Sequence, residues 1–227
     1  MSFFEGFSRE TLKFFEELAQ NNSKEWFESH RSDYDQYVLE PARGFVSAMG
    51  RKLQGLTPRI NAIPKVNQSL FRINRDIRFS HDKRPYKTNL GIWFWEGTRK
   101  RMECSGLYFH LGEGKLMLGT GIYIFSRDLL KLYRDAVSDK KHARSLEAAA
   151  NKISEKGYEI RGKHYKRLPR GYDALHGQEE FLLFNGLTAV IEEDAPKDLY
   201  SSSIVEYAFS HYENMYPLHE WLIKAIG

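Results

Sequence analysis

The chain has 227 residues, a formal net charge of +4 and 41% hydrophobic residues, which is typical of a globular protein that builds its own core. It has no apolar run approaching 18 residues, and its start lacks a basic segment followed by an apolar one, so we expect neither a membrane span nor a cleaved secretion signal. Cys104 is the only cysteine, which excludes an internal disulfide and is typical of a reducing compartment. We therefore expect a cytoplasmic protein.

Charge is unevenly distributed along the chain. From Lys65 to Arg101, ten Lys and Arg residues stand against three Asp and Glu residues, and from Tyr172 onward two stand against ten. A uniformly basic domain would indicate nucleic acid, and this polarity fits that class less well. It favours a local site for an anion with an acidic surface elsewhere, or two regions that attract each other within the fold.

Helical spacing of apolar residues covers the N-terminal third. Ser8 and Ser23 are placed to cap the first two helices, and Pro41 stands where a third begins. The second helix has an aromatic inner face that includes Trp26 and Phe27. We expect this face to pack on a sheet, with a ligand pocket as the less favoured alternative.

The stretch from Phe71 to Phe79 alternates apolar and polar residues, which predicts a strand with one buried face. Arg75 breaks the alternation and would point to the apolar side. A buried guanidinium needs a carboxylate, carbonyl groups or a bound anion. The following segment around Pro85 predicts a loop that returns further cations toward the same strand.

Later segments predict more strands. One is expected over 90–95, and a hairpin is expected over 105–111 and 115–125, turning at Glu113 and Gly114. In this register Leu107, Phe109 and Leu111 face the core, while Tyr108 and His110 stand on the opposite face. Gly106, Gly119 and Gly121 leave a trough on that face, which indicates either close approach of a ligand or chain segment, or glycines covered by an aromatic ring.

The remaining elements are helices after Ser126 and from about Lys141, a short mixed strand after Tyr158, an edge or closing strand over 186–193, and one or two C-terminal helices broken near Pro217. Strands linked by hairpins, without alternating βαβ units, predict an α+β fold. We expect a mainly antiparallel sheet packed against an N-terminal helical layer and C-terminal helices.

The central motif also carries a resemblance. The string F-R-I-x-R-D-x-R-F-x-x-D-K-x-P-Y-K, from Phe71 to Lys87, resembles the signature of a widespread bacterial and fungal family of unknown function. The likeness extends over nearly the whole chain, through Asn21, Asn22, Trp26 and Phe27, the strand around Tyr108 and His110, and a late Leu-Pro-Arg-Gly-Tyr at 168–172. It implies one compact domain over residues 1–227 and supplies no activity.

The residues themselves suggest an anion site. Asp76 and Asp82 cannot neutralise all the cations near them, and Arg side chains hold phosphate or carboxylate oxygens in pairs. The residues expected to line the ligand pocket are Arg72, Arg75, Arg78, Lys83, Tyr86, Lys87, Tyr108, Gly119 and Gly121. The alternative is a structural network in which Arg75 pairs with Asp76, Asp82 or Glu103.

Candidates for general acid or base work are His110, Asp76, Tyr86 and His81. We expect no covalent nucleophile, no metal and no cofactor, because the sequence has no G-x-S-x-G, no H-E-x-x-H, no P-loop and no G-x-G-x-x-G. Two other classes stay open. One is a nucleic-acid module that stacks bases on Trp93, Trp95, Tyr86 and Tyr108, and the other is a protein-interaction domain whose acidic C-terminal part docks a basic partner.

Overall fold

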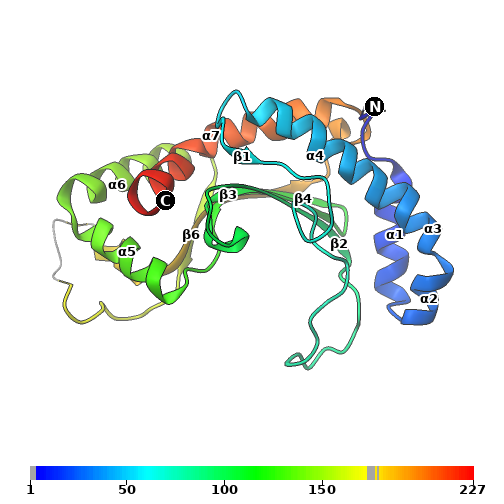
Figure 1. Ribbon diagram of the computed structural model, residues 1–227, viewed down its shortest axis with the longest axis horizontal. Coiled ribbons are helices and arrows are strands. Elements are labelled where there is room, and N and C mark those ends of the chain that lie inside the picture. The colour runs from blue at the N-terminus through cyan, green and yellow to red at the C-terminus, as the bar shows by residue number, and fades with distance from the viewer. Residues whose placement is uncertain (1–3, 173–176, 178) are drawn as a thin grey trace. The chain divides into compact units, whose positions relative to one another are not determined.

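The computed structural model describes residues 4–172, 177 and 179–227 (Figure 1). Its α-helices are α1 (Arg9–Gln20), α2 (Lys24–Ser29), α3 (Arg31–Asp33), α4 (Glu40–Leu53), α5 (Arg127–Ser138), α6 (Lys140–Ser154) and α7 (Ser203–Ile226). A π-helix, η1 (Tyr34–Leu39), joins α3 to α4, and short 3-10 helices are η2 (Arg101–Glu103), η3 (Glu179–Leu183) and η4 (Lys197–Tyr200). The strands are β1 (Ile60–Asn61), β2 (Asn89–Glu96), β3 (Gly106–Gly112), β4 (Lys115–Ile122), β5 (Glu159–Lys163) and β6 (Phe184–Asp194).

The strands form one antiparallel six-stranded sheet in the order β1-β2-β3-β4-β6-β5. The α+β class is confirmed, as are the strand expected over 90–95 and the hairpin that follows it. The strand expected over 186–193 is confirmed as β6, but the edge position, one of its two predicted placements, is wrong because β6 lies between β4 and β5. The antiparallel partner on its outer side is the short β5, in which Ile160 pairs with Ala189.

Contacts divide the chain into two compact units, which are described separately. The first comprises Met1–Phe94, Tyr108–Met117 and Glu192–Ser210, and the second comprises Trp95–Leu107, Leu118–Ile191 and His211–Gly227. The single domain implied by the family resemblance stays a prediction.

The core of the first unit is aromatic and lies between α4 and the strands. Phe45 of α4 contacts Phe109 of β3 and Phe94 of β2, with ring centroids 4.6 and 6.4 Å apart, and Phe7 stacks on Phe109 at 5.7 Å. Phe7, Phe45 and Phe109 are each at most 2% exposed. Burying a side chain of this size contributes about 1.5–3 kcal/mol, so these contacts fix which face of the strands is covered.

The opposite face of β3 therefore carries the alternate residues. Phe109 and Leu111 are fully buried under the helices, while Tyr108 and His110 are half-buried on the other side. The turn between β3 and β4 has positive φ at both Glu113 (53°) and Gly114 (72°), as the twist of a two-residue hairpin requires. The predicted turn at Glu113 and Gly114 is therefore confirmed.

The strand predicted from Phe71 to Phe79 is wrong. The segment from Phe71 to Phe79 is irregular, and its isolated bridge is the antiparallel one between Asn74 and Tyr86. Ile73 is buried but Phe79 is 94% exposed, so the apolar residues of the alternation do not share a buried face. Backbone hydrogen bonds join its two arms near the base, a turn in which the Ser80 amide donates to the Ile77 carbonyl lies at its tip, and Figure 1 shows it extending away from β2 as a long loop.

The second unit is organised around Tyr133 of α5. Its ring stacks on Phe125 at 4.6 Å and meets the edge of Trp221 at 6.0 Å, and its hydroxyl donates to the Phe181 carbonyl at 2.9 Å. Burial raises the Tyr133 pKa strongly. Cys104 is also buried in this unit, where its thiol donates to the Arg99 carbonyl at 3.6 Å.

A buried polar chain lies in the same unit. Ser105 Oγ is 2.9 Å from His219 Nδ1, and His219 Nε2 is 3.1 Å from Glu96 Oε2. Ser105, His219 and Glu96 are 2%, 0% and 7% exposed. Groups buried this deeply need such partners, because an unpaired polar group in a core costs free energy.

The expected break near Pro217 does not occur. Helix α7 runs through it to Ile226. A proline inside a helix costs about 3 kcal/mol, but the buried Met215, Leu218 and Trp221 flank it, and each contributes a comparable amount by burial. None of the described helices has the length and apolar character needed to cross a membrane.

Candidate functional site: a basic loop and the adjoining sheet face

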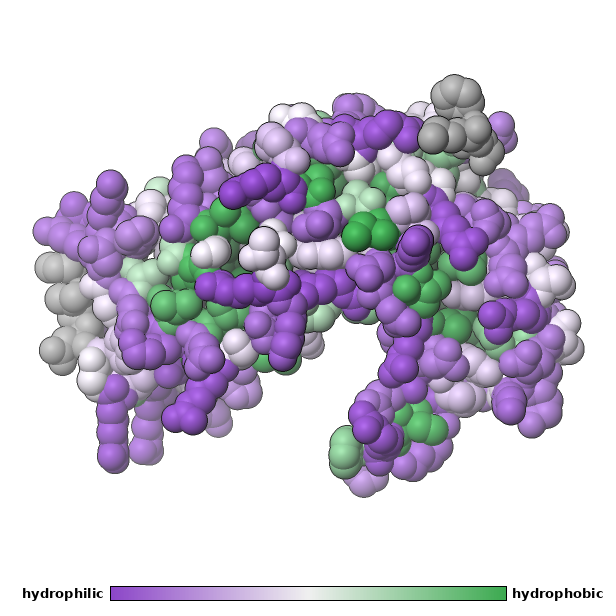
Figure 2. All heavy atoms as spheres, in the orientation of Figure 1, coloured by the Kyte–Doolittle hydropathy of each residue, from purple (hydrophilic) through white to green (hydrophobic). Residues whose placement is uncertain are grey.

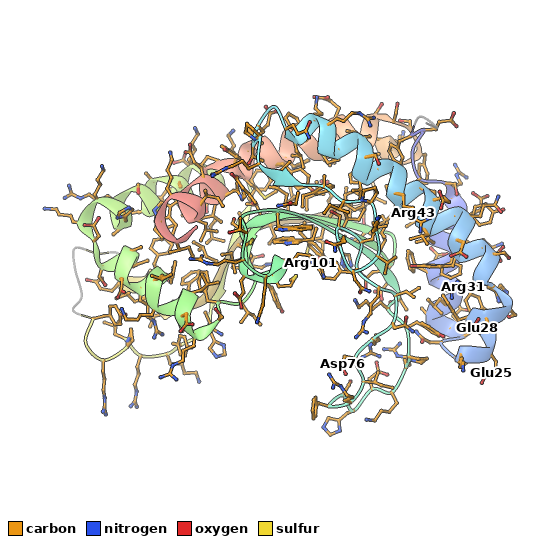
Figure 3. The ribbon with its side chains drawn as sticks, in the orientation of Figure 1. Glu25, Glu28, Arg31, Arg43, Asp76 and Arg101 are labelled. Atoms are coloured by element: carbon orange, nitrogen blue, oxygen red, sulfur yellow. The ribbon has the colours of Figure 1, made fainter. Side chains whose placement is uncertain are left out.

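The long excursion before β2 concentrates positive charge. Residues Arg72–Lys87, hereafter the basic loop, contain six Lys and Arg residues and two Asp residues. Its two arms are joined at the base, where the Arg75 amide donates to the Pro85 carbonyl and the Lys87 amide donates to the Ile73 carbonyl, both at 2.8 Å. Figure 3 shows the labelled Asp76 on the projecting part, beyond this base.

Asp82 gathers two of the cations. Arg84 donates to it through Nε and Nη2 at 2.8–3.1 Å, and Arg75 Nη1 reaches the same carboxylate at 2.8 Å. Arg75 Nη1 also donates to the Arg84 carbonyl at 2.9 Å. These hydrogen bonds, first those from Arg84, hold the pKa of Asp82 far below its usual range. The alternative in which Arg75 pairs with Asp82 is therefore present in the structure, and its side chain is 26% exposed rather than fully buried.

Asp76 is engaged by one cation. Arg78 donates to it from Nε at 2.9 Å and from Nη2 at 2.7 Å, and the Arg78 amide adds a bond at 3.3 Å. These hydrogen bonds lower the pKa of Asp76 to about 2. A carboxylate held in this way stays ionised at neutral pH, so Asp76 is poorly suited to accept or donate a proton there.

Among the described residues, Arg72 and Lys83 make no hydrogen bond with either carboxylate of the loop. Lys83 Nζ donates to the Ile77 carbonyl at 3.1 Å, and Lys87 Nζ donates to the Arg72 carbonyl at 3.0 Å. The Arg72 guanidinium is exposed and makes no hydrogen bond with any residue that the structure describes. With six Lys and Arg residues and two Asp residues, the loop has a net charge of +4.

The tip of the basic loop is apolar. Phe79 is 94% exposed, and the Arg78 guanidinium lies 5.8 Å from its ring centroid. Figure 2 shows hydrophobic atoms at the end of this projection, surrounded by hydrophilic ones. The alternating pattern had assigned Phe79 to a core, so this feature was missed by sequence reasoning.

Tyr86 lies at the base of the basic loop and packs against α2. Its ring stacks on Phe27 of α2 with centroids 4.2 Å apart, and it is 5% exposed. Its amide donates to Asn22 Oδ1 and its carbonyl accepts from Asn22 Nδ2, both at 3.0 Å. The structure thus places Tyr86 as an anchor of the loop, and the aromatic face of the second predicted helix packs as core.

Beside the loop, the face of β2 and β3 that points away from Phe45 and Phe109 holds an aromatic cluster. The Tyr108 hydroxyl and the Phe71 ring both lie 3.1 Å from the position that a Cβ of Gly91 would take. Phe71 meets Tyr108 edge-on at 6.1 Å, and Lys87 Nζ lies 5.3 Å from the Phe71 ring centroid. Tyr108 therefore covers a glycine of β2, and the residues at the base of the loop adjoin it.

His110 is part of this face. Its Nδ1 is 3.3 Å from Asn89 Nδ2 and 3.2 Å from the Tyr108 hydroxyl. An amide nitrogen only donates, so Nδ1 accepts and the neutral ring carries its proton on Nε2. Burial lowers the His110 pKa, opposed by the charges of Glu192 and Glu113. His110 is thus neutral at pH 7, with Nε2 as its donor.

Gly119 and Gly121 belong to the second unit, where β6 lies against them. A Cβ on Gly119 would meet Val190 Cγ1 at 2.9 Å. Gly121 has φ of 122°, and a Cβ there would meet the Leu187 carbonyl oxygen at 2.1 Å. The close approach predicted at these glycines is therefore that of another strand of the chain.

The rings proposed for base stacking are covered. Trp93, Trp95 and Tyr86 are 5–7% exposed. His81 lies exposed in the basic loop. Within the part of the chain that the structure describes, no group of three or more His, Cys, Asp or Glu residues is arranged to hold a metal ion.

Comparison with known proteins gives one match. Residues 10–221 match the model of a family described as a conserved hypothetical protein, DUF2461. No curated protein and no solved structure matches the chain.

Proposed function

Since the chain belongs to DUF2461, a family whose description names no activity, we propose from the site alone that the basic loop and the adjoining sheet face bind an anion carrying phosphate or carboxylate groups. We propose that this takes place in the cytoplasm, because the single Cys104 is typical of a reducing compartment.

One observation carries the proposal. The two carboxylates of the loop are bound by Arg75, Arg78 and Arg84, yet Arg72 and Lys83 lie in the same 16 residues without a hydrogen bond to either carboxylate among the described residues. A guanidinium presents a planar fork of donors that suits phosphate and carboxylate oxygens. The exposed Arg72 guanidinium, which is not committed to a hydrogen bond with a described residue, is the main donor that we assign to the ligand.

Residues at the base of the loop supply the rest of the site. Lys87 lies beside Phe71, whose ring contacts Tyr108, so a ligand bound by Arg72 and Lys87 would lie near the aromatic cluster. If a reaction takes place there, His110 is the group best suited to move a proton, because its lowered pKa keeps it neutral.

Thermal unfolding of the full chain with added anions tests the proposal. The probes are inorganic phosphate, tripolyphosphate and citrate, because ligands that bind only the folded state raise Tm. We expect tripolyphosphate to raise Tm for the wild type and the Arg72→Ala variant to lose most of this rise. Lys24→Ala, which removes an exposed charge from α2, is the matched control and should keep it.

Two results would contradict the proposal. One is no Tm change with any of the three anions. The other is an equal Tm rise in the wild type, Arg72→Ala and Lys24→Ala proteins, because the anion would then bind elsewhere or act as a general salt.

A further inference from the structure

We propose that the anion bound by the basic loop is a single-stranded nucleic acid, and that Phe79 stacks on one of its bases. The inference rests on the proposed function and names the class of its ligand. It assigns stacking to a residue at the tip of the loop, in place of the four rings that the sequence pattern indicated.

The exposure of Phe79 is the first observation. At 94%, it exceeds that of every other large exposed apolar side chain among the described residues, the next being Tyr123 at 75%. A single exposed apolar side chain needs no explanation by itself. Here, however, the ring is accompanied by the Arg78 guanidinium at 5.8 Å and stands at the end of a loop with a net charge of +4. Aromatic rings between cations are the combination that binds single strands.

The second observation is that the loop is held in shape before any ligand binds. Arg75 and Arg84 converge on Asp82, Arg78 binds Asp76, and Lys83 donates to the Ile77 carbonyl. The Arg75–Asp82 and Lys83–Ile77 contacts link the two arms, and the other contacts brace each arm within itself. A loop fixed in this way loses less conformational freedom on binding, which favours affinity.

The distribution of charge on the basic loop favours a single-stranded nucleic acid over a small anion or a membrane. The cations lie along both arms of the loop, and Arg78 and Arg84 have side chains that are 76% and 57% exposed. Charges spread in this manner suit successive phosphates of one polymer rather than a single compact anion. At the tip only Phe79 is an exposed large apolar side chain among the described loop residues, which is little apolar area for insertion into lipid. A single strand, unlike a duplex, offers the unstacked base faces that a ring requires.

Fluorescence anisotropy with a labelled 20-nucleotide deoxythymidine strand tests the inference on the full chain. We expect binding that weakens linearly on a logarithmic scale as salt increases. Loss of one stacking contact weakens binding by about tenfold, so Phe79→Ala and Phe79→Leu should both show this loss. Tyr123→Ala removes an exposed ring in the second unit and should bind like the wild type. Arg72→Ala, which removes the main donor assigned to the ligand, should reduce the salt slope by about one unit.

The same proteins separate the possible failures. If the wild type binds tripolyphosphate but not the deoxythymidine strand, the inference is overturned and the proposed function stands. If it binds neither, the inference and the proposed function are both overturned. Equal binding of the strand by the wild type and Phe79→Leu overturns the stacking role. If the wild type binds phosphatidylserine vesicles but not the deoxythymidine strand, and Phe79→Ala abolishes the vesicle binding, the loop binds a membrane instead and the inference is overturned. Circular dichroism spectra that match the wild type confirm that each variant is folded.

Discussion

The side-chain amide of Asn22 makes two hydrogen bonds with the backbone of Tyr86, a residue 64 positions later in the chain. Its oxygen accepts from the Tyr86 amide and its nitrogen donates to the Tyr86 carbonyl, as a neighbouring strand would do. Phe27 stacks on the ring of the same tyrosine. Two segments of the family resemblance, the early Asn-Asn pair with its Trp-Phe and the Pro-Tyr-Lys that ends the basic loop, are therefore parts of one anchor.

Asn22→Ala should destabilise the protein by roughly 1–3 kcal/mol, because it leaves both the amide and the carbonyl of the buried Tyr86 without these partners. Urea unfolding measures the change. Asn21→Ala is the matched control, since the exposed Asn21 side chain donates only to the Glu17 carbonyl of its own helix, and the cost should stay within about 0.5 kcal/mol. Equal losses in the two variants would contradict the anchoring role.

Arg75 and Arg78 should respond differently to removal. Arg75→Ala breaks bonds to both Asp82 and the Arg84 carbonyl at a side chain that is 26% exposed, and we expect a loss of roughly 1–2 kcal/mol. Arg78→Ala breaks a pair in which the Arg78 side chain is 76% exposed, and because solvent screens such a pair we expect a smaller loss than for Arg75→Ala. Parallel urea curves give both values, and a larger loss for Arg78→Ala would show that the loop is stabilised in another way.

His110 should titrate below the ordinary histidine range in the folded protein, because burial lowers its pKa. The unfolded chain then binds more protons than the folded chain between the two pKa values, so this group's contribution to stability is complete above the unfolded pKa of about 6.5 and declines as pH falls below it. NMR titration of the ring protons measures the pKa. Glu192→Gln removes a charge that raises it, so the His110 pKa should fall further in that variant, and an upward shift would refute the assignment.

The buried chain of Ser105, His219 and Glu96 should be costly to interrupt. Glu96→Leu alone leaves His219 Nε2 without this acceptor, and His219→Phe alone leaves the carboxylate without this donor, so each single change should cost about 3–5 kcal/mol. The double variant removes both polar groups and should be less destabilised than the sum of the singles. A double-mutant cycle in urea measures this coupling, and simple additivity would argue against a direct interaction.

Much of the fold follows from local pattern. The hairpin was predictable because alternation at Leu107 to Leu111 coincides with a turn sequence, Glu113-Gly114, that tolerates positive φ. The basic loop shows the same alternation from Phe71 to Phe79 yet forms no strand. Its backbone amides at Arg78 and Arg84 bond instead to the side-chain carboxylates of Asp76 and Asp82, which a two-residue periodicity does not predict.

The candidate site was predictable in composition but not in arrangement. An excess of cations near Arg72 can be counted from the sequence, whereas the burial of Tyr86 depends on where α2 lies. Gly119 and Gly121 illustrate the same limit. Their lack of side chains indicated a close approach, but only strand order reveals that β6 is the partner.

Burial gives Cys104 a practical value. As the chain's only cysteine, with a thiol that is 5% exposed and a pKa raised by burial, it should react slowly with maleimide until its surroundings open. The fraction of molecules that gain the mass of one maleimide would then report the fraction that has opened, in native buffer and without an introduced cysteine. The wild-type chain thus contains a built-in sensor with which the stability of every variant above can be ranked.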